Sequence, residues 1–349
     1  MNIGNFHKKE VEGGCGVIGF ACTVPLSGKY LYRPLVQMHN RGNGKGGGIA
    51  AVGCFPDFYD HYALQVGYLE ESIREELEAR FIRPYFRVDH VEEHPDAGDY
   101  HNIPGLEIQP PRVIRYFVRV RAEVLERYAR ERGYRDLEPS EAQFVFENSY
   151  NINRAFYAGR NEKLALVLSH GKNLCVFKGV GYAEQLLAYY RLEELKAQVW
   201  IGHQRYPTRG RVWHPGGAHP FVGLNEALVH NGDFANYYSV CQYLAQKGIH
   251  PLFLTDTEIA ALLFDYYSRV LGYDLEIVIE AIAPTTERDF DLLPKFKQRL
   301  YRAVRSAHIH GSPDGPWFFI IGRSLPPSRR VQLIGITDTS MLRPHVFGL

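Results

Sequence analysis

The chain has 349 residues, of which 45% are hydrophobic, and its 40 Lys and Arg against 39 Asp and Glu give a formal net charge of +1. This balance is typical of a globular protein with one large domain or two ordinary ones. The near-neutral charge argues against nucleic-acid binding, which needs a basic excess. No apolar run approaches the roughly 18–20 residues of a membrane-spanning helix. The first fourteen residues lack the apolar core of a secretory signal, so we expect a cytoplasmic protein.

The cysteine and histidine patterns predict no metal site. No CxxC pair occurs among the five cysteines, Cys15, Cys22, Cys54, Cys175 and Cys241. This spacing disfavours a zinc site, an iron–sulfur cluster and a disulfide scaffold. The histidine pairs 90/94 and 308/310 each lack a third ligand of matching type nearby.

The first part of the chain predicts strands around a helix, followed by an insertion. Residues 15–22 and 46–55 are short apolar runs with glycines, which favour buried strands, and residues 30–40 favour a helix. From about 56 to 150, acid-rich helical patterns alternate with proline-rich turns. We interpret residues 56–150 as an inserted helical lobe beside the core, because their charge density is too high for central strands.

Strand patterns then return in hairpin-like groups. Residues 163–171 and 173–179 predict a hairpin that turns at Gly171–Asn173. Further strands are predicted at 197–206 and 226–234, and an antiparallel pair at 315–322 and 330–339. Grouped strands favour an α+β fold with antiparallel sheets over alternating β-α-β units.

Two helices are predicted after these strands, at 234–248 and 256–272. Thr255 or Asp256 is placed to cap the second helix, and Glu258 is placed to complete a capping box.

Cys15 follows two glycines at the start of the first strand. One interpretation is a small buried hydrophobic residue. The alternative is that residues 1–14 are a propeptide whose removal leaves Cys15 with a free α-amino group. That amine has an ordinary pKa of about 7.7–8.0, so one residue would carry both nucleophile and base.

Three polar positions close predicted strands or open a helix. Arg205 is either a surface residue before a turn or a bidentate partner for a substrate carboxylate. Asn231–Gly232 is either a hairpin turn or a pair of oxyanion donors, one from a side-chain amide and one from an open backbone N–H. Asp256 is either a helix cap or a partner for a substrate ammonium group.

The order of these motifs resembles one family. Cys-Gly-Val-Ile-Gly, Arg-Gly-x-x-x-Gly-Gly, Arg-Tyr-x-Thr-x-Gly, Ala-His-Pro-Phe, His-Asn-Gly-Asp and Thr-Asp-Thr-Glu follow one another from residue 15 onward. The chain thereby resembles class II glutamine amidotransferases of the N-terminal-nucleophile (Ntn) hydrolase superfamily. Within that class it most resembles the glutaminase component of glutamate synthase. The resemblance implies a four-layer α/β/β/α sandwich with two antiparallel sheets, in one amidotransferase domain over 15–349.

The resemblance also implies roles for individual residues. Cys15 would be the nucleophile, and Asn231 and Gly232 the oxyanion hole. The residues implied to bind or support the glutamine substrate are Arg205, Thr208, His219, Asp256 and Arg41. Arg209 stands where relatives often carry His, so the role of that position is open.

The implied reaction is hydrolysis of L-glutamine to glutamate and ammonia, with no cofactor in this chain. The ammonia would pass to a partner synthase, implied to carry FMN and iron–sulfur clusters, in a hetero-oligomer. Two alternatives stay open: a glutaminase that serves an N-methylglutamate-type synthase, and a non-catalytic glutamine-binding or assembly subunit. The glycine-rich run 42–48 lacks the Lys-Ser/Thr pair of a phosphate loop, so a tight turn near the glutamine pocket is the favoured interpretation.

Overall fold

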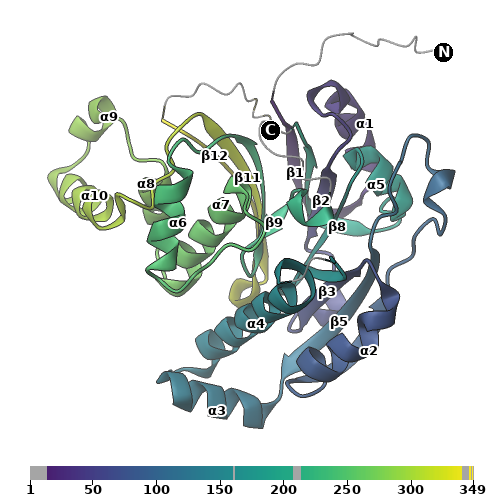
Figure 1. Ribbon diagram of the computed structural model, residues 1–349. Helices are drawn as coiled ribbons and strands as arrows, with labels where there is room; N and C mark the ends of the chain where they lie inside the picture. Colours follow the sequence, from purple (N-terminus) through teal and green to yellow (C-terminus); the bar gives the residue numbers. More distant parts are fainter. Residues whose placement is uncertain (1–13, 160–161, 207–213, 340–345, 347, 349) are drawn as a thin grey trace.

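The computed structural model describes residues 14–159, 162–206 and 214–339, together with Val346 and Gly348. These residues form three four-stranded sheets, and every strand pairing is antiparallel. Helices cover the sheets, so the fold is mixed α and β with antiparallel sheets, as expected from the grouped strand patterns (Figure 1).

The first sheet carries the N-terminal strand. Its strands, in spatial order, are β1 (Gly16–Ser27), β8 (Lys196–Gln204), β2 (Gly47–Val52) and β7 (Leu174–Gly179). Helices α1 (Lys29–Gln37) and α5 (Ala183–Tyr189) pack on one face of this sheet. Helix α1 can approach this closely because residue 202 of β8 is glycine. A Cβ on Gly202 would lie only 2.7 Å from Leu35 of α1.

The second sheet packs against the opposite face of the first. Its strands, in spatial order, are β12 (Arg330–Thr337), β11 (Trp317–Leu325), β10 (Glu226–Gly232) and β9 (Phe221–Val222). The two sheets approach closely, since a Cβ on Gly19 of β1 would lie 2.8 Å from Ile320 of β11. The hydrophobic core between the sheets is therefore built from both, as with Val199 and Val229.

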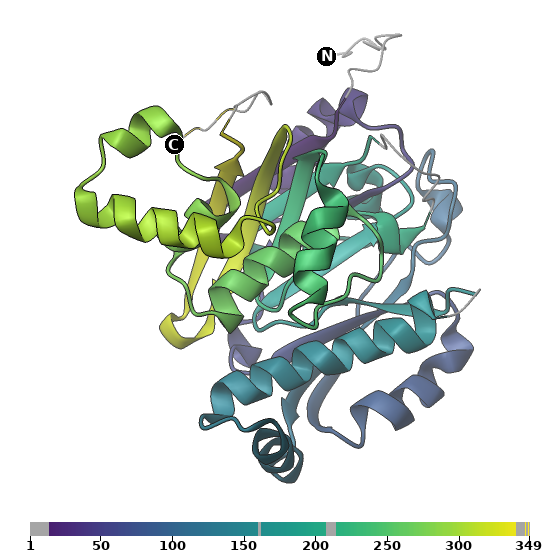
Figure 2. The ribbon, with the colours of Figure 1, turned by 60° about the vertical axis from the view of Figure 1, so that its left-hand side comes forward.

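The other face of the second sheet is covered by helices. Helices α6 (Tyr237–Ala245) and α7 (Asp256–Asp265) lie against it, and α7 is almost completely buried (Figures 1 and 2). Three more helices extend this side of the molecule, α8 (Leu275–Ile282), α9 (Glu287–Asp291) and α10 (Lys295–His308). The cap expected on α7 is present, because the Thr255 hydroxyl accepts a hydrogen bond from the Glu258 N–H at 3.1 Å.

The region 56–150 is not a purely helical lobe, which corrects the expectation from its charge. Its helices are α2 (Arg74–Leu77), α3 (Ala122–Arg132) and the first part of α4 (Leu137–Asn153). It also supplies three strands of the third sheet, whose spatial order is β4 (Phe86–Glu93), β5 (Arg112–Val120), β3 (Tyr62–Tyr68) and β6 (Ala165–Ser169). Figure 2 shows α4 lying across this sheet.

Strand β5 can lie in the interior of the third sheet because its buried charged residue, Arg115, has hydrogen-bond partners. Arg115 is 1% exposed, and its guanidinium donates to Gln65 and to Glu92. The same guanidinium lies 4.4 Å from the ring centroid of Phe55. A buried Arg with several partners is tolerated in a strand, so charge density did not exclude one here.

The hairpin expected at Gly171–Asn173 is also wrong. Strand β6 pairs with β3 in the third sheet, whereas β7 pairs with β2 in the first. The turn therefore carries the chain from one sheet to another. In contrast, β11 and β12 form the antiparallel pair that the sequence predicted.

Among the described residues, the helices are too short or too polar to cross a membrane. The described part of the chain also contains no group of three or more His, Cys, Asp or Glu side chains arranged to hold a metal ion.

Candidate active site

One cavity of about 580 Å³ gathers the motifs at the ends of the two packed sheets. Cys15 precedes β1, Arg205 follows β8, Gly232 ends β10, and Asp256 begins α7. The lining residues are Cys15, Arg205, Tyr206, His219, His230, Gly232, Asp233, Phe234, Ala235, Tyr237, Tyr238, Leu254, Thr255, Asp256 and Pro316. Antiparallel pairing brings these positions together, since Gly16 of β1 pairs with Gln204 of β8.

The Cys15 thiol contacts main-chain groups. Its Sγ lies 3.3 Å from the Tyr206 amide nitrogen and 3.6 Å from the Tyr206 carbonyl oxygen. Burial raises the pKa of the thiol to about 11, although the Tyr206 amide and the positive charge of Arg205 oppose the rise. Among the described residues, no carboxylate or imidazole forms a hydrogen bond with Sγ. The thiol therefore needs a base from elsewhere to become a nucleophile at neutral pH.

Arg205 is held by the glycine-rich segment. Its N–H donates to the Gly46 carbonyl at 3.0 Å, and its carbonyl accepts from the Asn43 N–H at 3.1 Å. The side chain is only 8% exposed, and a Cβ on Gly46 would lie 3.0 Å from its Cδ. Burial lowers the pKa of Arg205 despite the nearby Cys15 and Asp256. The glycines thus make room for a buried guanidinium, in agreement with a turn beside the pocket.

Strand β10 ends at the cavity through Gly232. This glycine has φ +144°, and a Cβ there would lie 2.1 Å from the Pro316 carbonyl oxygen, so only glycine fits without a shift. Asn231 is 4% exposed and does not line the cavity. Because side chains alternate along a strand, Asn231 shares a face with Val229, toward the first sheet. Its Oδ1 accepts no hydrogen bond among the described residues.

Asp256 belongs to a buried chain of polar contacts. Its Oδ1 lies 3.5 Å from His230 Nδ1, and that nitrogen lies 3.3 Å from the Thr257 hydroxyl. The hydroxyl is also 2.9 Å from His219 Nε2. Burial alone would raise the pKa of Asp256, but His230 and the N–H groups of Thr257 and Phe234 outweigh it and lower that pKa. Asp256 is therefore a carboxylate at neutral pH.

His219 supports this chain as a neutral ring. Its ring centroid lies 3.8 Å from that of His203, and burial, followed by the charges of neighbouring rings, lowers its pKa well below the ordinary value. A Cβ on Gly48 would lie 2.2 Å from the His219 carbonyl oxygen. The glycine-rich segment therefore packs against His219 as well as Arg205.

The resemblance also implies roles for Arg41 and Thr208, of which the structure describes only Arg41. Arg41, in the short 3₁₀ turn His39–Arg41, donates from Nε to the Cys15 carbonyl at 3.3 Å, so it lies at the site without lining the cavity. Thr208 and the divergent Arg209 lie outside the described residues.

Sequence reasoning missed several residues of the site. The motifs contain His230, Thr257 and Asp233 but indicate no role for them. The signal was present, because each lies next to a named residue in His-Asn-Gly-Asp or Thr-Asp-Thr-Glu. Glu258 is placed differently from the expected capping box. Its carboxylate accepts from the N–H groups of residues 252, 253 and 254.

The comparisons with known proteins include a relative that matches over most of the chain. An uncharacterized protein of Archaeoglobus fulgidus is 33% identical over 325 residues, which cover 93% of this chain and 79% of that protein. The chain belongs to the same family as this protein. No protein-family model matches the chain.

Other similarities are partial. A glutamine–fructose-6-phosphate aminotransferase of Campylobacter jejuni is 31% identical over 137 residues, covering 33% of this chain and 22% of the relative. A glutamine amidotransferase-like protein of Rhizobium meliloti is 32% identical over 96 residues, covering 27% of this chain and 32% of the relative. A B. subtilis glutamine phosphoribosylpyrophosphate amidotransferase structure gives a TM-score of 0.25 at 22% identity, over 43% of this chain and 26% of that one. Part of the chain is therefore similar to a glutamine–fructose-6-phosphate aminotransferase and to a glutamine amidotransferase-like protein, of whose lengths it spans less than a third.

Proposed function

We propose that this protein is a glutaminase that hydrolyses L-glutamine with Cys15 as nucleophile. The observation that carries the proposal is the cavity that brings the Cys15 thiol together with the Arg205 guanidinium and the Asp256 carboxylate. Free glutamine has a carboxylate at one end, an ammonium beside it and an amide at the other end. Arg205 suits the first group and Asp256 the second, which leaves the amide for the thiol.

The base in this mechanism is the α-amino group of Cys15 itself. With the Gly14–Cys15 bond intact, the Cys15 nitrogen is an amide and the thiol has a pKa of about 11. Attack of the thiol on the Gly14 carbonyl carbon forms a thioester and breaks the Gly14–Cys15 peptide bond. The thiol proton passes to the departing nitrogen, which becomes the free amine. Water then hydrolyses the thioester and releases residues 1–14. The freed amine has an ordinary pKa near 7.7–8.0, which suits a base at neutral pH.

The mature reaction then proceeds in two steps. The amine takes the thiol proton, Sγ attacks the glutamine amide carbon, and the amine returns the proton to the departing ammonia. Water resolves the thioester to glutamate and regenerates the thiol. We propose that the Asn231 side-chain amide and the Gly232 N–H stabilise the oxyanion of each step.

The ammonia acceptor is proposed on the resemblance to glutamate synthase. There the released ammonia passes to a partner chain with flavin and iron–sulfur cofactors, and the fold is the four-layer Ntn-hydrolase sandwich. The helix, sheet, sheet and helix packing of this chain supports that fold. A partner of the N-methylglutamate-synthase type, or a non-catalytic glutamine-binding role, are the alternatives.

Glutamate release from glutamine tests the proposal. The wild-type protein, Cys15→Ala and the control Cys22→Ala are assayed with and without native cell extract. Cys22 lies on β1 outside the cavity, so Cys22→Ala should keep full turnover. Cys15→Ala should lose turnover but keep glutamine binding. Equal turnover in Cys15→Ala and wild type would contradict catalysis by Cys15, and binding without turnover in every sample would favour the non-catalytic alternative.

A further inference from the structure

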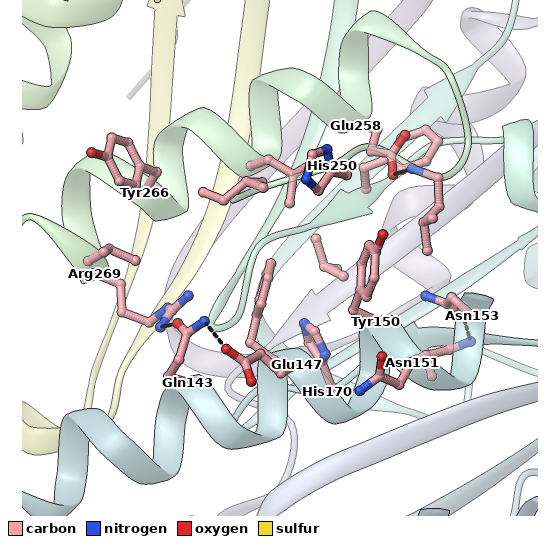
Figure 3. Close-up of a pocket in the computed structure, with 18 of the residues that line it drawn as sticks. Gln143, Glu147, Tyr150, Asn151, Asn153, His170, His250, Glu258, Tyr266 and Arg269 are labelled. Carbon is pink, nitrogen blue, oxygen red and sulfur yellow. Dashed lines mark hydrogen bonds between the residues drawn. The ribbon is translucent and has the colours of Figure 1, made fainter. Parts of the chain in front are cut away.

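A second cavity of about 550 Å³ lies between the inserted lobe and the side of α7. It shares no lining residue with the cavity of Cys15. Its walls come from α4, from β6 and β7, and from residues 247–270. Figure 3 shows Tyr150 of α4 pointing across it toward the segment that carries His250 and Glu258. The proposed glutaminase mechanism uses none of these residues.

A buried lysine lines this cavity without a directly bonded carboxylate among the described residues, although the charge of Glu258 acts on it. Lys178 of β7 is 3% exposed, and its Nζ forms no hydrogen bond or ion pair among the described residues. The ammonium lies 4.1 Å from the ring centroid of Phe221 and 5.5 Å from that of Phe253, and both rings line the cavity. Aromatic faces offset only part of the cost of removing a cation from water.

The carboxylates that line the cavity are already engaged. Glu258 accepts hydrogen bonds from three backbone N–H groups, at 2.6, 2.8 and 3.0 Å, and forms no ion pair with Lys178 among the described contacts. Glu147 accepts from Arg132 at 3.1 Å and from Gln143 at 3.2 Å. Neither carboxylate neutralises Lys178 by direct contact, so the cavity offers an unfilled place for a negative group.

A second buried polar atom points to a ligand. His170 is 6% exposed and lines the cavity, and its Nε2 is bonded to the Gly223 carbonyl. Because that carbonyl accepts, Nε2 carries the proton and Nδ1 is an acceptor. Nδ1 has no partner among the described residues. Natural proteins satisfy most buried polar atoms, so two unpartnered groups that line one cavity suit a ligand with polar atoms of its own.

We infer that this cavity is a second ligand site, which binds a small organic anion through Lys178. The carboxylate or phosphate of the ligand pairs with the lysine, and its apolar body packs against the aromatic lining. The lining side chains that suit such a body are Phe146, Tyr150, Phe221, Phe253 and Leu262. The site goes beyond the proposed glutaminase function, and either can fail while the other holds.

Calorimetric titration of the whole protein tests the inference. The probes are phenylacetate, phenyl phosphate and neutral phenylacetamide, each at millimolar concentration. At least one of the two anions should bind, and the amide should bind at least tenfold more weakly. A preference between the anions shows whether the site accepts carboxylate or phosphate.

Substitutions assign the binding to Lys178. Lys178→Met and Lys178→Gln should each weaken anion binding at least tenfold, with a thermal melt to show that each variant is folded. Lys196→Met is the matched control, because Lys196 is exposed at the start of β8 and lines neither cavity. Three outcomes would overturn the inference: no binding of either anion, equal binding of the neutral amide, or wild-type affinity in both Lys178 variants.

Discussion

The cavity of Cys15 presents one buried cation and one partly buried carboxylate to a substrate. Arg205 is 8% exposed and its burial lowers its pKa, while its contacts with the Gly46 main chain fix its position. The Asp256 side chain is 24% exposed and is held by His230. A substrate with a carboxylate and an ammonium group would meet a group of opposite charge at each of these two positions.

We predict that Arg205→Lys and Asp256→Asn each raise the KM for glutamine at least tenfold, with a smaller effect on stability. Lys cannot reproduce the bidentate guanidinium, and Asn removes the charge that faces the ammonium group. Steady-state kinetics together with thermal melts check this. Arg87→Lys, on the exposed edge strand β4, is the control and should leave KM unchanged. An unchanged KM in both site variants would remove the assigned roles.

Asn231 should affect turnover rather than affinity. We predict that Asn231→Ala lowers kcat by about 10²–10³, the usual loss for one oxyanion donor, and leaves KM within a few fold. Its stability should change little, because Oδ1 accepts no hydrogen bond among the described residues. Single-turnover measurements separate the two effects. A collapse of affinity with normal turnover of bound glutamine would make Asn231 a ground-state contact.

Lys178 should impose a pH dependence on stability. Burial lowers its pKa to about 7 from the ordinary 10.5, and the charge of Glu258 opposes this. Between these values the unfolded chain binds a proton that the folded chain does not, so the free energy of unfolding rises with pH. The cost is fully present below about pH 7 and disappears as the pH rises toward 10.5.

We therefore predict that Lys178→Met is more stable than wild type at pH 7, by about 1–4 kcal/mol, on the order of the gain found when a buried ion pair is replaced by apolar groups. The difference should shrink by pH 10. Urea unfolding at several pH values measures it, and comparison of the two proteins cancels the titration of other groups. Glu258 is the exception. Burial raises its pKa to about 7 and the charge of Lys178 opposes the rise, so Lys178→Met should also change the pKa of Glu258. A variant less stable than wild type at pH 7 would contradict the prediction.

At the scale of elements, α7 connects the two cavities. Its first turn supplies Asp256 to the cavity of Cys15. Glu258, two residues further along the same turn, lines the second cavity. The Glu258 carboxylate also anchors the backbone of residues 252–254, and Leu254 lines the cavity of Cys15. The start of this helix therefore sets the position of Asp256.

Removal of the Thr255 cap should affect both stability and glutamine binding. Loss of its hydrogen bond to the Glu258 N–H in Thr255→Ala should cost about 1 kcal/mol and raise the KM for glutamine, because Asp256 lies in the freed first turn. Thr286→Ala is the matched control, since Thr286 caps α9 by the same contact to the Asp289 N–H, away from both cavities. It should cost a similar stability and leave KM unchanged. Equal kinetic effects in the two variants would contradict a positioning role for the cap.

The elements that the sequence predicted well are those whose pattern is local. Strands β8, β10, β11 and β12 are apolar runs bounded by turn residues, and the cap of α7 needs only Thr255 and its neighbours. The third sheet was missed because its central strand contains Arg115, whose partners Gln65 and Glu92 are distant in sequence. Lys178 was missed for the same reason. Its buried setting depends on Phe221 and Phe253, which lie more than forty residues away along the chain.

At the scale of the whole molecule, two packed sheets bring motifs from about 240 residues of sequence to one cavity, from Cys15 to Asp256. The order of motifs was enough to select those residues, but not to show how they are held. Contacts such as the stacking of His203 on His219 and the packing of Gly48 on the His219 carbonyl are made only in the folded chain. Roles tied to a motif are therefore visible in the sequence, whereas supporting residues need the three-dimensional structure.

We expect residues 1–14 to be removed at the Gly14–Cys15 bond in active protein, by attack of the Cys15 thiol on the preceding carbonyl. Gly14 has φ +113°, a conformation that other residues rarely adopt, so Gly14→Ala should slow removal. Cys15→Ala should retain all fourteen residues, and the control Cys22→Ala should lose them as wild type does.

Intact mass and N-terminal sequencing measure the processing, and glutamate release from the same samples measures activity. The two should rise together, because the uncleaved chain has an amide in place of the base and a thiol whose pKa burial raises to about 11. At pH 7.5 such a thiol is almost entirely protonated and has no base beside it, so the precursor should turn over glutamine slowly. The attack on the Gly14 carbonyl is intramolecular and is needed only once per chain, so it can proceed with the same thiol. Full activity in a chain that still begins at Met1 would contradict the mechanism, and Cys15 would then need a base from another part of the protein.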